Sequence, residues 1–263
     1  MYVWNQKVRP AWWGWGYWTI ANAVDAWTCP MATSNYYDEC LEFSLDWLHF
    51  YTSNNATSSW PFQVDLATAW DITSATRSID LHSTMYYGRN WNWNGTPHWN
   101  ADGSQCTNCY WTVIKTWVPW SSRDLSQSAT VLRQDTSSEY GNFNRWWKFI
   151  KNGEMVIMDA TTYELWTAYD LRTIDWNSVK TCSWVSGWDS DSFVSDDGKH
   201  LYYTAPERQT AHLELSTAWD VSTATLVESI NERASWIYFH GDKMYLKYRA
   251  GNVKQFTVMV SWV

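Results

Sequence analysis

Short runs of alternating apolar and polar residues dominate the hydrophobic pattern of this chain. Val64 and Leu66 flank Asp65, and Leu213 and Leu215 flank Glu214 in the same way. Successive side chains of a β-strand point to opposite faces of its sheet, so this alternation is typical of a strand with one buried face. Because turn-forming residues separate many such runs, the pattern predicts an all-β fold.

One phrase recurs along the chain. The segment "VDLATAWDITSAT" at 64–76 returns as "LELSTAWDVSTAT" at 213–225, and weaker copies bring the number of units to six. Aligned on a central aliphatic residue, the copies have the anchors Ile20, Leu66, Leu125, Leu171, Leu215 and Val258. These anchors lie 43–46 residues apart, except for one interval of 59. A period in the forties is that of a four-stranded propeller blade, so we expect a β-propeller. Six blades are preferred, and five or seven also fit.

A second element recurs in a matching phase. Its copies lie at 43–51, 98–111, 148–158, 193–203 and 238–248, and four of the five carry Gly beside Asp or Asn near the centre. Such pairs favour the positive φ of a tight hairpin, so each copy is expected to form the inner two strands of a blade. The Trp-Asp phrase then ends the third strand and leads into the fourth. We expect the first and last units to be incomplete, or to be shared where the ring closes.

The long interval contains an insertion at about 82–99, within what we expect to be a single domain over 1–263. Its sequence, "HSTMYYGRNWNWNGTPHW", alternates aromatic residues with Asn and matches no repeat position. Packing between blades does not demand such a segment, so it is a candidate binding loop. A Trp face can stack on a sugar ring or anchor a protein contact. The candidate binding residues are Trp91, Trp93, Asn94 and Trp99, with Trp12, Trp13 and Trp15 near the N-terminus.

The repeated Trp-Asp pairs are interpreted as structural. Asp71 and Asp220 follow the third strand, where a carboxylate can accept hydrogen bonds from N–H groups two or three residues later. Trp70 and Trp219 are expected to lie between blades. Other carboxylates recur at one repeat position in this alignment: Asp65, Asp124, Asp170 and Glu214. Residues related by pseudo-symmetry share one environment, whereas an acid and base pair needs two, so we predict no catalytic residues among them.

The repeat resembles one found in predicted propeller proteins of bacteriophages and aquatic bacteria. The residues that carry the resemblance are "LSTAWDVSTAT" at 215–225 and the preceding "SDDGKHLYY" at 195–203. Units two and five match closely, and the others match mainly in their period. The resemblance implies a β-propeller without known catalytic activity, often in virion, tail or adhesion-related proteins.

Composition narrows the choice of partners. The chain has 24 Trp and 16 Tyr, and its net charge of -8 disfavours a nucleic-acid partner, which needs a basic surface. We expect no membrane span and no signal peptide in this chain. Five irregularly spaced Cys do not predict a disulfide framework, and "CTNC" at 106–109 has no second ligand pair, so no metal and no cofactor is predicted.

The sequence therefore favours a non-enzymatic structural or interaction module, with virion decoration, tail or fibre assembly, or adhesion as its setting. Its partners would be other virion proteins or a host-surface glycan, and its location the extracellular particle. The alternative is a lectin-like propeller that binds glycan through the insertion or the grooves between blades. A glycan-active enzyme ranks third.

Overall fold

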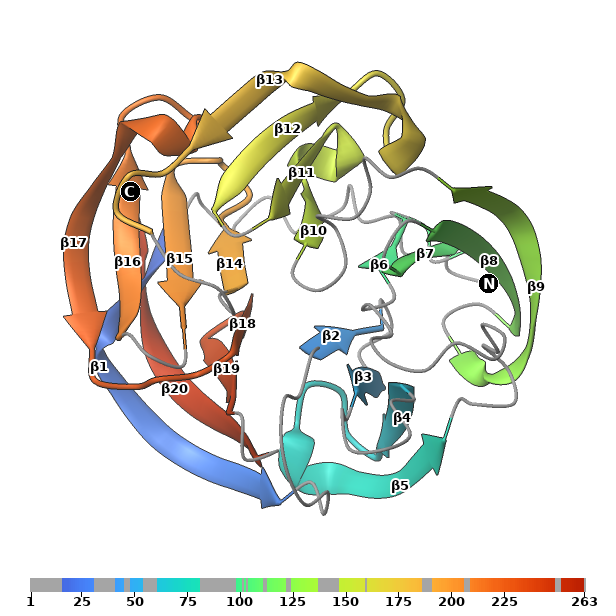
Figure 1. The fold of residues 1–263 in the computed structure, drawn as a ribbon. Helices are drawn as coiled ribbons and strands as arrows, with labels where there is room; N and C mark the ends of the chain where they lie inside the picture. Colours follow the sequence, from blue (N-terminus) through green and yellow to red (C-terminus); the bar gives the residue numbers. More distant parts are fainter. Residues whose placement is uncertain are drawn as a thin grey trace.

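The computed structural model describes most of the strands and the turns between them. The described residues are 16–30, 41–44, 48–53, 61–80, 98–100, 102, 104–110, 113–121, 124–136, 147–158, 160–185, 191–205, 209–248 and 252–262. In this part of the chain, strands pair into five four-stranded antiparallel sheets that stand around a common centre (Figure 1). The chain is thus an all-β, five-bladed β-propeller.

The blades are numbered here I to V in chain order. Blade I contains β2 (Leu41–Phe43), β3 (His49–Ser53), β4 (Pro61–Leu66) and β5 (Ala75–Asp80). Blade II contains β6 (His98–Trp99), β7 (Cys106–Tyr110), β8 (Val113–Ser121) and β9 (Asp124–Thr136). Blade III contains β10 (Trp147–Ile150), β11 (Met155–Met158), β12 (Thr161–Leu165) and β13 (Ile174–Thr181). Blade IV contains β14 (Asp191–Val194), β15 (His200–Thr204), β16 (Thr210–Leu215) and β17 (Ala224–Ile230). Blade V contains β18 (Trp236–His240), β19 (Lys243–Lys247), β20 (Asn252–Trp262) and β1 (Gly16–Pro30).

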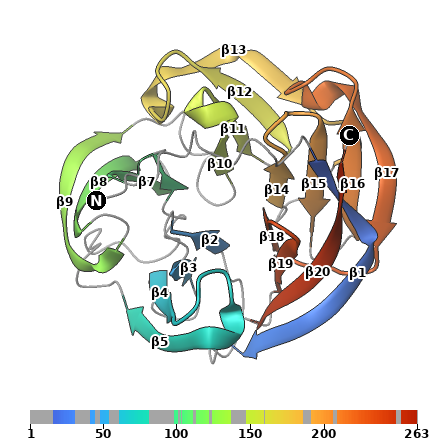
Figure 2. The same cartoon turned by 180° about the vertical axis from the view of Figure 1, so that it is seen from behind.

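Blade V closes the ring, and it explains why the preferred count of six blades is wrong. Strand β1 pairs antiparallel with β20, so the N-terminal strand completes the sheet built by the C-terminal strands (Figure 2). Ile20 and Val258, used as anchors of two separate units, are 0% and 3% exposed in one apolar cluster of this region. The first and last units are therefore shared at closure, and the six sequence copies make five blades.

Two further anchors were misplaced. Leu125 lies in β9, a fourth strand, and Leu171 lies in the 3-10 turn η4 (Leu171–Thr173). The third strand of blade III ends at Leu165, so Leu165 corresponds to Leu66 and Leu215. The motif in blade III contains Tyr where the others contain Trp, and its predicted anchor lies six residues after the true equivalent.

The hairpin prediction is confirmed in all five blades, because each recurring hairpin segment overlaps strands one and two of its sheet and includes the turn between them. The first strands lie nearest the centre of the ring and the fourth strands lie at its rim (Figure 1). Gly153, Gly198 and Gly241 occupy their turns with φ of 80°, 72° and 54°. A residue without a side chain enters this region at little cost, which accounts for the recurring glycine.

An ion pair near the centre connects three blades. The Lys148 ammonium of β10 donates to the Asp191 carboxylate of β14 at 2.5 Å and to the Ile237 carbonyl of β18 at 2.9 Å. Asp191 also accepts a hydrogen bond from the Ile237 N–H at 3.0 Å. Lys148 and Asp191 are buried, so each charge depends on the other for compensation. This pair fastens blades III, IV and V at their inner strands.

Candidate functional site

Three blades share one turn between their third and fourth strands. Its sequences are "LATAWDITS" at 66–74, "LWTAYDLRT" at 165–173 and "LSTAWDVST" at 215–223. In each turn an aspartate caps a short 3-10 helix: η1 (Ile72–Ser74), η4, or η5 (Val221–Thr223). Asp71 accepts a hydrogen bond from the Thr73 N–H at 2.9 Å, and Asp220 accepts one from the Ser222 N–H at 3.0 Å. Asp71 and Asp220 therefore cap their turns.

The aromatic residue before the aspartate has a left-handed backbone in all three turns. The φ angles of Trp70, Tyr169 and Trp219 are 64°, 62° and 68°. Bulky residues rarely adopt this conformation, so other contacts must hold it. The Tyr169 N–H donates to the Gly153 carbonyl at 2.9 Å, and the Trp219 N–H donates to the Gly198 carbonyl at 2.8 Å. The turn is therefore bonded to the first hairpin of its own blade.

The aromatic ring lies directly over that hairpin glycine. A Cβ atom on Gly153 would lie 2.4 Å from the Tyr169 ring, and one on Gly198 would lie 2.3 Å from the Trp219 ring. Glycine is thus required for two reasons: the positive φ and the space that the ring occupies. This contact explains why the two recurring elements of the sequence keep a fixed phase.

Each ring also faces the preceding blade, and at two junctions the ring packs directly on apolar or aromatic neighbours. Between blades V and I, Trp70 stacks on His240 with ring centroids 3.4 Å apart and planes inclined by 7°. Between blades III and IV, Trp219 packs on an apolar cluster that includes Ile157 and Ala160 of blade III. Trp70 thus contacts the neighbouring blade, and Trp219 packs on a cluster that blades III and IV share.

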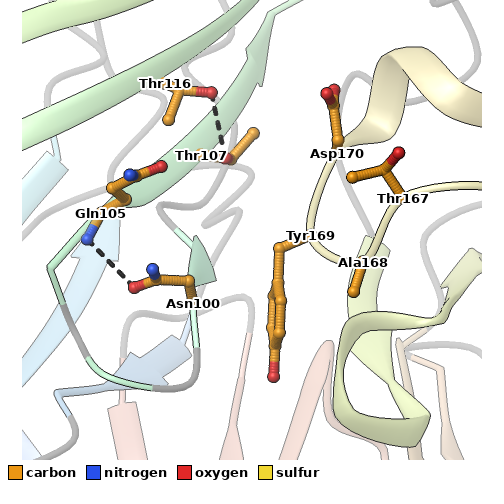
Figure 3. A pocket seen from close by; sticks show the side chains of 8 residues that line it. All are labelled: Asn100, Gln105, Thr107, Thr116, Thr167, Ala168, Tyr169 and Asp170. Atoms are coloured by element: carbon orange, nitrogen blue, oxygen red, sulfur yellow. Dashed lines mark hydrogen bonds between the residues drawn. The ribbon is translucent and has the colours of Figure 1, made fainter.

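The corresponding junction between blades II and III is open. A cavity of about 200 Å³, here named the II/III pocket, lies beside Tyr169. Its lining residues are Asn100, Gln105, Thr107 and Thr116 of blade II with Thr167, Ala168, Tyr169 and Asp170 of blade III. Figure 3 shows the two groups facing each other across the pocket. Tyr169 is smaller than the Trp of the other turns, and the residues opposite it are polar.

Hydrogen bonds arrange the blade II side of the II/III pocket. The Gln105 N–H donates to Asn100 Oδ1 at 3.0 Å, and Asn100 Nδ2 donates to Ser104 Oγ at 3.2 Å. The hydroxyl oxygens of Thr107 and Thr116 lie 3.3 Å apart (Figure 3). These bonds hold an amide and two hydroxyls at the pocket wall.

Charge at the II/III pocket is largely compensated. The Arg172 guanidinium donates to both carboxylate oxygens of Asp170, with Nε 2.7 Å from Oδ1. Burial raises the pKa of the Tyr169 hydroxyl, and the nearby Asp102 carboxylate adds to the shift. Hydrogen bonds from Ser104 lower the pKa of Asp102. At neutral pH, Tyr169 is therefore an uncharged hydroxyl that can donate and accept hydrogen bonds.

Trp166 is the second unusual residue of the blade III turn. Its side chain is 79% exposed, whereas the equivalent positions hold the small residues Ala67 and Ser216. It directly precedes Thr167, which lines the II/III pocket. The turn that lacks the interblade Trp thus presents a Trp to solvent instead.

Of the predicted binding residues, Trp99 alone is among the described residues. Trp91, Trp93, Asn94, Trp12, Trp13 and Trp15 fall outside the described residues. Trp99 belongs to β6, is 6% exposed and contacts Tyr51 with ring centroids 5.7 Å apart. A buried ring offers no surface to a partner, so its position favours a packing role between blades I and II.

Sequence reasoning missed Tyr169, Trp166 and the blade II wall. The signal for the first two was present, since aligning 165–173 with 215–223 shows Tyr in place of Trp and Trp in place of Ser. Asn100 and Gln105 carried no such signal, because only the fold brings their hairpin to the turn of the next blade.

A chain of titratable groups occupies the junction between blades IV and V. Glu228 of β17 accepts hydrogen bonds from the Ile20 and Ala21 N–H groups of β1, at 2.6 and 3.2 Å. His212 Nδ1 lies 3.3 Å from Glu228 Oε1, and His212 Nε2 lies 3.0 Å from His200 Nδ1. Burial and the neighbouring His200 lower the pKa of His212 to about 4, against the opposing effects of Glu228 and Glu214. Burial also lowers the pKa of His200.

The described residues contain neither a metal-binding cluster nor a membrane-spanning helix. Among the described residues, no three His, Cys, Asp or Glu side chains gather closely enough to hold a metal ion. No described helix has the length and apolar character needed to cross a membrane. Cys106 and Cys182 are buried free thiols, and burial raises the pKa of both.

No protein-family model matches the sequence, and no curated protein matches it. The structure is similar to the WD40 repeats of RRP9, with a TM-score of 0.49 and 7% identity over 88% of this chain and 97% of that one. A chain of the mitotic checkpoint complex gives 0.48 and 11% over 90% and 95%. The Cps50 (Swd1) β-propeller domain of Myceliophteria thermophila gives 0.43 and 12% over 90% and 100%. At these scores and identities the likenesses carry no functional argument, and the assignment as a five-bladed β-propeller rests on the strand pairing.

Proposed function

We propose that this propeller is a non-enzymatic binding module that holds its partner at the II/III pocket. The observation that carries the proposal is the departure of one junction from the repeat. Trp70 stacks on His240 and Trp219 packs on an apolar cluster, whereas Tyr169 borders a cavity with polar walls. Departures from a consistent local pattern concentrate at functional sites, where packing is given up for another purpose.

The chemistry of the II/III pocket suits holding a ligand better than transforming it. Asp170 is engaged by Arg172, and Tyr169 keeps its proton at neutral pH because burial raises its pKa. General acid and base catalysis requires two groups with separated proton affinities near the operating pH. The lining instead offers amides and hydroxyls, which form stable directional hydrogen bonds.

The setting we propose is a bacteriophage particle, in which the propeller decorates, joins or adheres. The support is the resemblance of its repeats to those of predicted phage propellers. In such an assembly the surface beside Trp166 would contact a neighbouring virion protein or a host-surface glycan. A glycan partner is the second candidate, and the polar lining of the II/III pocket favours it.

Site-specific crosslinking in purified native particles tests the proposal. A photo-crosslinking amino acid is placed at position 166 and, as a control, at position 184. Trp184 is also exposed, at 53%, but it follows β13, which runs away from the II/III pocket toward the other end of the blade. We expect a defined adduct from position 166 and none from 184. Absence of the protein from particles contradicts the virion setting, and equal labelling from both positions contradicts the pocket as the contact.

A further inference from the structure

We infer that the II/III pocket binds a neutral polyhydroxylated ligand, namely a single sugar residue, with Trp166 as an aromatic platform beside it. The inference rests on the proposed function, because it assigns a ligand class to the same pocket. It uses Tyr169, Trp166 and the blade II wall, none of which belongs to the insertion.

The hydrogen-bonding groups match a sugar. Each sugar hydroxyl both donates and accepts, and so do the amides and hydroxyls that line the II/III pocket. The Gln105 side-chain amide and the Tyr169 hydroxyl belong to two of the lining residues, and each can both donate and accept hydrogen bonds. A polar wall binds poorly to an apolar ligand, because its donors and acceptors would lose water without compensation.

Charge argues for a neutral ligand. None of the eight described lining residues is Lys or Arg, so the lining offers no cation to bind phosphate or sulfate. A cationic ligand is also disfavoured, because the Asp170 carboxylate that could bind it is already paired with Arg172. The Asp102 carboxylate outside the lining is engaged by the N–H of Ser104 at 2.9 Å. What remains is a set of uncharged donors and acceptors.

Size and surroundings narrow the ligand further. The volume of about 200 Å³ lies below the roughly 300–1,000 Å³ typical of drug-sized ligands, which indicates one ring instead of a long oligosaccharide. Trp166 supplies a broad exposed aromatic face directly before Thr167 in the chain. Aromatic faces pack on the C–H surface of a sugar, while amides and hydroxyls bond its edge. The arrangement suits the terminal residue of a neutral glycan.

A glycan array followed by calorimetry on the intact protein tests this inference. The array contains neutral, sialylated and sulfated glycans, and a tri-arginine peptide serves as the cationic probe. The pocket variants are Trp166→Ala and Thr116→Val, and the controls are Trp184→Ala and Thr181→Val. Thr181 is a matched control because it forms the same kind of hydroxyl pair, with Thr161 at 3.3 Å, away from the pocket. Circular dichroism and urea midpoints confirm that each variant folds.

We expect binding to neutral glycans that weakens about tenfold in each pocket variant and stays unchanged in both controls. Three results overturn the inference: no neutral glycan binds at millimolar concentration, all variants bind equally, or only the acidic glycans or the tri-arginine peptide bind. In each of these cases a specific crosslink from position 166 in the particle would still support the proposed function. Glycan binding without that crosslink would leave the ligand class standing and remove the virion contact.

Discussion

The junctions between blades II and III and between blades III and IV use the same construction and have opposite outcomes. In both, an aromatic residue with positive φ lies over a hairpin glycine and donates its N–H to that glycine's carbonyl. Trp219 then packs on an apolar cluster that includes Ile157, whereas Tyr169 lines a pocket together with Asn100 and Thr107. The repeat therefore determines where the ring lies, and ring size with the opposite wall determines whether the junction is filled or open.

The largest expected effect is on packing at the filled junction. Trp219→Ala should lower the free energy of unfolding by about 3–5 kcal/mol, because it removes a large side chain from an interblade core. Tyr169→Ala should cost only about 1–2 kcal/mol, since its ring already borders a cavity. Urea denaturation of both variants measures the difference. Similar midpoints for the two variants would show that the two rings contribute equally to stability, which contradicts the proposed difference in packing between the junctions.

At the junction between blades IV and V, protonation of His212 should make the free energy of unfolding depend on pH. The folded-state pKa of His212 is about 4, below the unfolded value of about 6.5. The unfolded chain therefore binds more protons in this window, so stability is full above pH 6.5 and is lost as the pH falls toward 4. The linked loss is on the order of 2–3 kcal/mol.

Urea midpoints at pH 7, 5.5 and 4 measure this loss, with His212→Asn as the comparison. The difference between wild type and variant isolates His212 from carboxylates that titrate in the same range. We expect the variant to show a shallower decline. Parallel curves would show that His212 does not contribute.

Glycine substitutions test the shared construction. Gly198→Ala and Gly153→Ala should each cost about 2 kcal/mol, because a Cβ there meets both an unfavourable φ and an aromatic ring. Gly241→Ala is the matched control: its φ is also positive, yet nothing lies within 4 Å of an added Cβ, so about 1 kcal/mol is expected. Thermal unfolding of all three suffices, and equal losses would mean that the ring contact contributes nothing.

The smallest effect is expected from a subtle change in ring size. Trp219→Tyr should cost about 1–2 kcal/mol, because it opens the filled junction partly. Tyr169→Trp should change stability by less than about 1 kcal/mol, since the larger ring has a cavity to enter. Urea midpoints test both substitutions. A large loss from Tyr169→Trp would mean that the II/III pocket cannot accept the larger ring.

The sequence predicted the propeller, the inner hairpins and the Trp-Asp turns because each depends on local patterns: alternation, Asn-Gly or Asp-Gly turns, and a capping aspartate. The blade count depends on which distant strands pair, and β1 with β20 is the longest-range pairing in the ring. The sequence also could not predict the pairing of Lys148 with Asp191 or the polar wall opposite Tyr169. Their partners belong to other blades, and no local pattern encodes which side chains meet there.

A crystal structure of the wild-type protein, soaked with neutral methyl glycosides and resolved well enough to show water, tests the central claim most directly. We predict an open space beside Tyr169 in which water, and then a sugar ring, bonds to Gln105 and Thr116. The junction at Trp219 should hold neither. A II/III junction closed by side chains, or a sugar bound only elsewhere on the protein, would contradict the account.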